Sequence, residues 1–285
     1  MKILITGAKG QVGTDVVIEA KKRKHEVYGF SSSELDITNQ QVVDSQLSSV
    51  MPDVVINAAA YTAVDKAETE QDKAYAINEL GVKNLADTCK KLDIPLLHIS
   101  TDYVFDGEKK EPYVETDTPN PTSVYGASKL AGEIALQKAW YKHIILRVSW
   151  VFGEHGNNFV KTMLRLAQER DEISVVDDQY GAPTPAQGIA SEIIKCVQSN
   201  QLDYGVFHLQ VDPGVTWYEF AQEVFSQSVE LGILAKSPVV RSITSNQFPT
   251  PVKRPSNSKL ASERLGVFSV LDWKLALRSM LTTLS

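Results

Sequence analysis

The chain has 285 residues, of which 43% are hydrophobic and 22% charged, and its formal net charge is −6. This composition is typical of a globular protein with a substantial core, and it offers no basic patch for nucleic acid. The two cysteines, Cys89 and Cys196, lie far apart and exclude a disulfide framework. The start has no signal-peptide core, and the longest apolar-rich run, 54–64, is too short to span a bilayer. We therefore expect a cytoplasmic protein with no membrane or nucleic-acid partner.

Short β-branched runs alternate with helical stretches through the first half of the chain. Apolar strands that alternate with helices predict βαβ units, and therefore an α/β fold with a doubly wound parallel sheet of the Rossmann type. The expected strands are 2–6, 25–30, 53–59, 95–101 and 143–153, and the expected helices are 11–23, 37–50 with Thr38 as N-cap, 72–93, and one that begins near Tyr125.

After about residue 150 this rhythm loosens. We predict a cofactor-binding Rossmann domain at 1–150, to which some later segments return. A smaller α/β substrate-binding cap is predicted mainly at 151–285. The later elements are expected to be helices at 157–170, up to about 198 and at 216–232, strands at 172–176 and 205–210, and two closing helices.

A glycine triplet follows the first predicted strand in "ITGAKGQVG". Gly7, Gly10 and Gly13 have the spacing GxxGxxG and open the next helix. Gly7 permits a tight turn, Gly10 allows a diphosphate to approach the backbone, and Gly13 allows close helix–strand packing. The free N–H groups of the helix start would then face the anion. The alternative is a glycine-rich turn without a ligand, but the strand–triplet–helix context favours a dinucleotide, with Gln11 and Val12 as further contacts.

The end of the second predicted strand, "GFSSSELD", bears on the choice of cofactor. NAD-selective sites usually place Asp or Glu there to bind the ribose 2′-hydroxyl. The expected position is Phe30 or Ser31, which carries no carboxylate. Because Ser31 can bind a 2′-phosphate and Lys9 can supply charge, we predict NADPH, with NADH as the alternative. Asp36 and Ile37 are predicted to contact the adenine side, against the plain alternative of an aspartate at a helix entry.

A hydroxyl, a tyrosine and a lysine form the predicted catalytic group. Thr101 ends a strand, and Tyr125 and Lys129 lie one turn apart on the following helix. Ligands of open parallel sheets bind at this carboxyl edge. Tyr125 could deliver a proton to a carbonyl oxygen held by Thr101, while the Lys129 ammonium would lower the tyrosine pKa from its ordinary value near 10.

The motifs "TGAKGQVG", "STDYVFDG" and "YGASK", in this order, resemble the extended branch of the short-chain dehydrogenase/reductase superfamily. The later motifs "NAAAYTAVDKAE", "GNNFVKTMLRLA", "DQYGAPT" and "RPSNSKL" narrow the resemblance to the dTDP-4-dehydrorhamnose reductase family, over nearly the whole chain. The resemblance implies hydride transfer from NADPH to C4 of dTDP-4-dehydro-L-rhamnose, with Thr101, Tyr125 and Lys129 as the catalytic triad. Lys129 would also bind the nicotinamide ribose.

The resemblance also implies roles for residues in several loops. Asn78 would support Lys129 through the proton relay, and its alternative role is helix packing. For Tyr103 and Trp150 the alternative role is core packing. The planar donors of Arg254 suit a diphosphate, and its alternative role is that of a solvated charge in a loop. The implied cofactor contacts are Ala58, Ala59, Ala60 and Thr62, and the implied substrate contacts are Thr62, Asp102, Tyr103, Trp150, Asn157, Asn158, Arg254 and Asn257.

Two questions stay open at this point. Some members of the family bind Mg²⁺ at a dimer interface through glutamates, and here only Asp15 matches one of them. We therefore expect no metal site and leave a homodimer as one option. The same superfamily also offers nucleotide-sugar epimerases or dehydratases, which favour an acidic residue after the second strand. A similar fold serves as a non-catalytic, NADP-binding regulatory subunit of some methionine adenosyltransferases.

Overall fold

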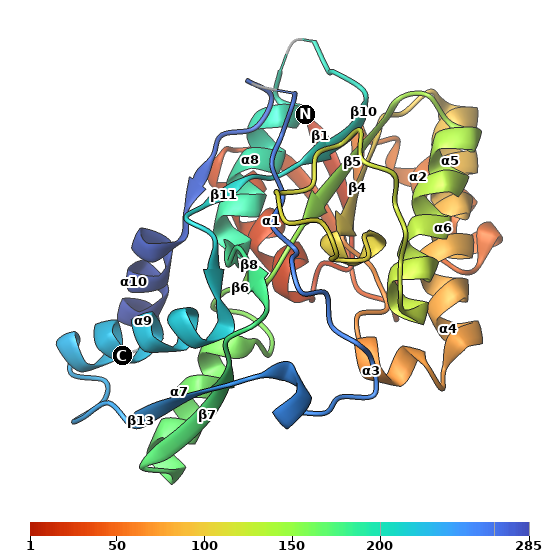
Figure 1. The fold of residues 1–285 in the computed structure, drawn as a ribbon. Coiled ribbons are helices and arrows are strands. Elements are labelled where there is room, and N and C mark those ends of the chain that lie inside the picture. Colours follow the sequence, from red (N-terminus) through yellow and green to blue (C-terminus); the bar gives the residue numbers. More distant parts are fainter. Residues whose placement is uncertain (200, 265, 285) are drawn as a thin grey trace.

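A computed structural model describes residues 1–199, 201–264 and 266–284, and Figure 1 shows its arrangement. Its first half alternates strands and helices as the sequence predicts. These elements are β1 (Lys2–Thr6), α1 (Gln11–Lys22), β2 (Glu26–Phe30), α2 (Gln40–Val50), β3 (Val54–Asn57), α3 (Val64–Ala67), α4 (Gln71–Tyr75), a π-helical turn (Ala76–Leu80), α5 (Gly81–Leu92), β4 (Leu96–Thr101), a 3₁₀ turn (Asp102–Val104), α6 (Val124–Ala139) and β5 (His143–Val148).

The second half contains shorter strands and four longer helices among the described residues. Its elements are β6 (Val151–Phe152), α7 (Phe159–Glu169), β7 (Glu172–Val176), β8 (Tyr180–Gly181), β9 (Thr184–Pro185), α8 (Ala186–Val197), β10 (Gly205–His208), β11 (Val211–Asp212), β12 (Val215–Thr216), α9 (Trp217–Glu230), β13 (Val239–Ile243), a 3₁₀ turn (Ser245–Gln247), β14 (Leu271–Asp272) and α10 (Trp273–Leu284).

The central sheet has six strands in the order β10-β5-β4-β3-β1-β2, and every neighbouring pair is parallel. Helices α1 and α8 pack their apolar side chains against one face, together with Ile3 and Ile5 of β1. Helices α2, α5 and α6 cover the other face, around Leu4 and Val55. This two-sided covering explains why the strands are almost continuously apolar. The predicted doubly wound Rossmann-type fold is confirmed.

A separate apolar cluster lies under α7, α9 and α10, with Phe220, Phe225 and Trp273 fully buried in it. The parallel pair β7–β13 packs on the same cluster, and Figure 1 shows these elements together on one side of the sheet. By contrast, α8 and β10 belong to the layers of the central sheet although they come late in the chain. The chain therefore crosses between the two regions more than once, while the predicted division at about residue 150 stays a prediction.

The predicted helix at 72–93 is present as α4, the π-helical turn and α5, which follow one another without a break. Two local predictions were wrong. Thr38 is not the N-cap of α2: the Asn39 side chain accepts from the N–H groups of the first turn, and the Thr38 hydroxyl donates to Asp36 instead. Of the two predicted closing helices only α10 occurs among the described residues after 258, because Leu260 forms a bridge with Tyr113 in extended conformation.

None of the helices within the described ranges is both long and apolar enough to cross a bilayer.

Candidate active site

The three predicted catalytic residues come together at the carboxyl edge of the sheet. Thr101 is the last residue of β4, while Tyr125 and Lys129 lie in the first turns of α6. The Ser123 side chain caps α6 by accepting from the Gly126 N–H, which fixes where the helix begins. All three side chains are buried, with Lys129 only 2% exposed. The site is therefore built on regular elements of the protein and is shielded from water.

Thr101 and Tyr125 form the centre of this site. Burial is the larger effect on the Tyr125 phenol and raises its pKa above the ordinary value, against the opposing effect of a hydrogen bond with Thr101. This differs from the expectation that Lys129 lowers it. Since a raised pKa keeps the phenol protonated at neutral pH, the site holds a proton donor beside a hydroxyl group.

The Lys129 amine makes polar contacts with residues of β4. Its Nζ donates to the Ile99 carbonyl at 2.7 Å and lies 3.2 Å from Nε2 of His98. Burial lowers the pKa of Lys129 to about 8, against the opposing effect of the Glu133 carboxylate. That carboxylate forms a buried ion pair with Arg147 at 2.6 Å. Lys129 is therefore a lysine that can exchange its proton near neutral pH.

The glycine turn between β1 and α1 fits a dinucleotide. Gly7 has a φ of +66°, and a Cβ there would lie 2.6 Å from the backbone of Ala58 and Ala59. A Cβ on Gly13 would lie 2.1 Å from the Gly7 carbonyl oxygen. The N-cap of α1 is Gly10, whose lack of a side chain leaves the first N–H groups without a side-chain partner. Two strand ends and a helix start thus form a narrow cradle with free donors for a diphosphate.

A carboxylate that the sequence analysis missed lies at the end of β2. Glu34 folds back to accept hydrogen bonds from the Ser31 backbone N–H at 2.8 Å and from the Ser31 hydroxyl at 2.5 Å. Lys9 forms an exposed ion pair with it at 4.0 Å. These bonds lower the pKa of Glu34. The spacing Ser-x-x-Glu, typical of a side chain that returns to the backbone three residues earlier, was the signal available in the sequence.

Other predicted cofactor contacts have structural partners of their own. The Asp36 carboxylate accepts from the Thr38 N–H and hydroxyl, as its plain alternative requires. Ile37 is buried against Gly81. The Asn78 amide bonds both backbone groups of Tyr61 and the Ser128 hydroxyl, so it joins the segment after β3 to α6. Among the remaining contacts, Gln11, Val12, Ala58, Ala59 and Ala60 are half-buried around the glycine turn, while Thr62 is exposed beyond it.

Asp102 and Tyr103 lie beside Thr101 and Tyr125, and Trp150 contacts the cap. Asp102 is buried and accepts from the Thr101 hydroxyl at 2.8 Å, and burial raises its pKa to about 7. The ring of Tyr103 meets that of Tyr125 edge-on, with centroids 5.5 Å apart. Trp150 adopts a φ of +43° and stacks on Trp217 of α9 with centroids 3.5 Å apart. Trp217, absent from the predicted site, therefore orients Trp150.

The cap reaches the site through Arg254. Its guanidinium donates to Asp65 of α3 at 2.6 Å and to the Tyr103 hydroxyl at 3.3 Å. Figure 1 shows the segment after β13 running from the cap past α3. The predicted arginine therefore lies beside Tyr103, whose ring contacts that of Tyr125, and Asp65 is a partner that was not predicted from the sequence.

Three asparagines that were predicted to bind substrate have no hydrogen bond to the predicted catalytic residues within the described part of the chain. Asn158 caps α7 and also approaches the Gln11 side chain at 3.4 Å, whereas Asn157 is exposed. The Asn257 amide donates to the carbonyl groups of the loop at 109–111, and its oxygen accepts from Lys259. This occupies the amide within the protein, so the structure accounts for Asn257 through loop packing.

No cluster of three or more metal-binding side chains occurs within the described ranges. Asp15 lies 3.6 Å from His155, and burial raises its pKa to about 6. The prediction that the protein has no metal site stays a prediction.

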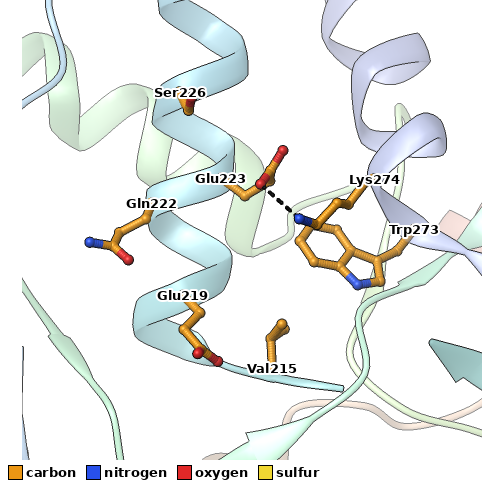
Figure 2. Close-up of a pocket in the computed structure, with 7 residues that line it drawn as sticks. All are labelled: Val215, Glu219, Gln222, Glu223, Ser226, Trp273 and Lys274. Atoms are coloured by element: carbon orange, nitrogen blue, oxygen red, sulfur yellow. Dashed lines mark ion pairs between the residues drawn. The ribbon is translucent and has the colours of Figure 1, made fainter. Parts of the chain in front are cut away.

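A shallow pocket between α9 and α10 lies apart from this site (Figure 2). It is lined by Glu219, Glu223, Trp273 and Lys274, among others. Glu223 pairs with Lys274 at 3.3 Å, and Glu219 accepts from the Thr216 N–H as part of a capping box. Both carboxylates therefore have partners, and we assign this pocket no function.

Comparison with known proteins decides the family. A family described as RmlD substrate binding domain matches residues 1–285. The chain belongs to this family. The dTDP-4-dehydrorhamnose reductase of Aggregatibacter actinomycetemcomitans is 45% identical, with 98% of each chain covered. That of Escherichia coli K12 is 39% identical, with 100% of this chain and 98% of its own covered. The family predicted from the motifs is therefore confirmed.

Solved structures agree with this assignment. A dTDP-4-dehydrorhamnose reductase from Clostridium acetobutylicum has a TM-score of 0.93 at 41% identity, covering 100% of this chain and 99% of its own. The Bacillus anthracis enzyme, solved in complex with NADP, has a TM-score of 0.92 at 37% identity and 99% coverage of each chain. A Thermus thermophilus UDP-glucose 4-epimerase, at 21% identity and a TM-score of 0.80, shares the fold. The chain is an NAD(P)H-dependent oxidoreductase.

Proposed function

We propose that this protein reduces the C4 keto group of dTDP-4-dehydro-L-rhamnose to give dTDP-L-rhamnose. The observation that carries the proposal is the buried Thr101–Tyr125 pair at the carboxyl edge of the sheet, with Arg254 of the cap beside it. Relatives that match this chain over nearly their full length are named dTDP-4-dehydrorhamnose reductase. A nucleotide sugar needs both a carbonyl-binding pair and a cation for its diphosphate, and these residues supply them.

The chain's own residues hold and move the proton. The Thr101 and Tyr125 hydroxyl groups bind the carbonyl oxygen, and Tyr125 donates its proton to that oxygen as the carbonyl carbon is reduced. The nicotinamide cofactor supplies the hydride. The raised pKa of Tyr125 keeps the proton on the phenol until the oxygen gains charge. Burial of the pair excludes water, which strengthens both hydrogen bonds in the transition state.

NADPH is the proposed cofactor, and NADH is a second substrate for the same site. The Glu34 carboxylate suits the 2′-hydroxyl of NADH, because it stands where an acidic residue usually binds that group. For NADPH, Glu34 has to release Ser31 and Lys9, which then bind the 2′-phosphate. A relative of 37% identity was solved in complex with NADP, which supports NADPH as the cofactor.

On the substrate side, Arg254 would bind the diphosphate and Trp150 would lie against the sugar. In this proposal Arg254 exchanges its Asp65 partner for a phosphate group, which is also negatively charged and can accept two hydrogen bonds from the guanidinium. Trp217 keeps the Trp150 ring in a fixed orientation by stacking on it.

Both free cysteines are buried, so we also propose that the protein works in the reducing cytoplasm.

The test is NADPH oxidation with dTDP-4-dehydro-L-rhamnose, repeated with NADH and with EDTA. We expect turnover with either cofactor and no effect of EDTA. Tightly bound NAD⁺ with no net redox change would instead indicate an epimerase or dehydratase. Absence of turnover, together with recovery of a larger partner enzyme, would indicate a regulatory subunit.

A further inference from the structure

A row of four buried polar side chains runs across the sheet to Lys129. Thr6 of β1, Asn57 of β3 and His98 of β4 face one another at the same register, and all three are fully buried. The Thr6 hydroxyl donates to Asn57 Oδ1 at 2.6 Å, Asn57 Nδ2 lies 2.9 Å from His98 Nδ1, and His98 Nε2 lies 3.2 Å from Lys129 Nζ. The reaction as described above assigns no role to Thr6, Asn57 or His98.

The row has a direction, which a backbone group sets. The Ala59 N–H donates to Asn57 Oδ1 at 3.1 Å. A backbone N–H can only donate, so this contact identifies Oδ1 as the acceptor and turns the Asn57 amide nitrogen toward His98. The amide nitrogen can also only donate, so His98 Nδ1 accepts and carries no proton. Burial lowers the pKa of His98 well below its ordinary value, so the ring is neutral with its proton on Nε2.

This tautomer places an N–H donor against Lys129. An ammonium group has three donors and no acceptor, whereas a neutral amine has a lone pair that can accept from His98 Nε2–H. The same amine still donates to the Ile99 carbonyl. The charged group that opposes this arrangement is Glu133, one turn along α6, and it is engaged by Arg147 and by the Ser100 hydroxyl. The contacts around Lys129 therefore stabilise its neutral form.

We propose that His98, held in its Nε2–H form by Asn57, is a positioning residue that stabilises the neutral amine left when Lys129 gives up a proton. Its part in turnover rests on the proposed function. When the carbonyl oxygen takes the Tyr125 proton, the phenolate takes a proton from the Lys129 ammonium. The resulting amine accepts from His98 Nε2–H, and a solvent proton restores the ammonium. Each turnover thus consumes one proton from solvent and one hydride from the cofactor.

Nuclear magnetic resonance of the protein without substrate tests the arrangement directly. In the wild-type protein, the ¹⁵N shifts of the His98 ring should show a neutral ring protonated at Nε2. A ring protonated at Nδ1 would overturn the proposal. This measurement needs no variant, so it stands even where a substitution prevents folding.

The substitution Asn57→Asp tests the consequence for Lys129. A carboxylate still accepts from the Ala59 N–H and from Thr6, but it also accepts from His98 Nδ1–H, which leaves Nε2 as an acceptor for the ammonium. We expect the pKa of Lys129 to rise by about one unit or more. This pKa is measured from the pH dependence of the Lys129 ¹³Cε resonance, which is assigned as the one missing from the spectrum of the Lys129→Arg protein. The matched control is Asn39→Asp, which adds the same charge at the exposed N-cap of α2 and should leave that resonance unchanged.

Turnover supplies the last readout. The alkaline limb of the kcat profile should move to higher pH in Asn57→Asp protein, with the KM for the sugar nucleotide unchanged. An unmoved Lys129 resonance in that variant would contradict the proposal. If the resonances behave as expected but no sugar nucleotide is reduced, the proposed function fails and the role of His98 in setting the Lys129 proton stands.

Discussion

The two sides of the site differ in how their polar groups are held. On the sheet side, Thr101, Tyr125 and Lys129 are buried, and each has partners that lie on strands or on α6. On the cap side, Arg254 is held by an ion pair with Asp65, a group that is itself partly exposed. Under the proposed function a substrate replaces that ion pair, whereas a rearrangement of the sheet side would disturb the core. The proposed proton-transfer group is thus set in advance, and the proposed binding group is exchangeable.

The largest effect is expected on the sheet side, at Tyr125. Replacement by Phe removes the proton donor while the ring still packs against Tyr103, so turnover should fall by about 10²- to 10⁴-fold. Binding of the nicotinamide cofactor, measured by fluorescence titration, should stay close to wild type. Turnover at the wild-type rate would remove Tyr125 from the mechanism and with it the contrast between the two sides.

The rigidity of the sheet side can be tested by stability. Glu133→Gln leaves Arg147 buried without its charge partner, which should lower the free energy of unfolding by about 3–5 kcal/mol. Denaturant unfolding followed by circular dichroism measures this change. The control is Glu169→Gln, which breaks an exposed pair with Arg165 on α7 and should cost less than about 1 kcal/mol. Equal losses in the two variants would mean that the sheet side is no more rigid than the surface.

A smaller effect is expected on the cap side, and it should appear in binding. Arg254→Ala removes a charged hydrogen-bond donor worth about 1.5–3 kcal/mol, so KM for the sugar nucleotide should rise by about 10- to 100-fold while kcat changes little. Asp65→Asn removes the competing carboxylate and should lower KM. Steady-state kinetics of both variants, with the cofactor saturating, separate these outcomes. A fall in kcat without a change in KM for Arg254→Ala would place this arginine with the preset groups.

The smallest effect is expected at the end of β2. Glu34→Gln removes the charge that opposes a 2′-phosphate, so the ratio of kcat/KM for NADPH to that for NADH should rise about two- to fivefold. Glu26→Gln is the matched control. Glu26 is likewise an exposed carboxylate, but it lies on β2 itself and its side chain accepts from the Tyr28 hydroxyl. A ratio that stays constant in Glu34→Gln protein would show that the carboxylate does not contribute to cofactor choice.

Much of the site was predictable because it depends on local patterns. The glycine triplet lies between a strand and a helix, and the Tyr-x-x-x-Lys spacing places two side chains on one face of α6. The residues that were not predicted take part in contacts across a turn or between segments far apart in the sequence. Glu34 returns to Ser31 across a turn, Asp65 meets Arg254 across 189 positions, and Trp217 stacks on Trp150 from another helix. Spacing within a segment carries no information on such pairs.

The sequence by itself determined the fold class and the family, and it supplied the three proposed catalytic residues. These follow from apolar periodicity and from short motifs whose physical roles are local. Only the tertiary structure decided the state of those residues. Burial raises the pKa of Tyr125 where the nearby lysine was expected to lower it. The alignment of Thr6, Asn57 and His98 on three neighbouring strands brings to Lys129 the hydrogen-bond direction that the Ala59 N–H sets at Asn57. Desolvation and strand register depend on the whole packed sheet, so no single segment contains them.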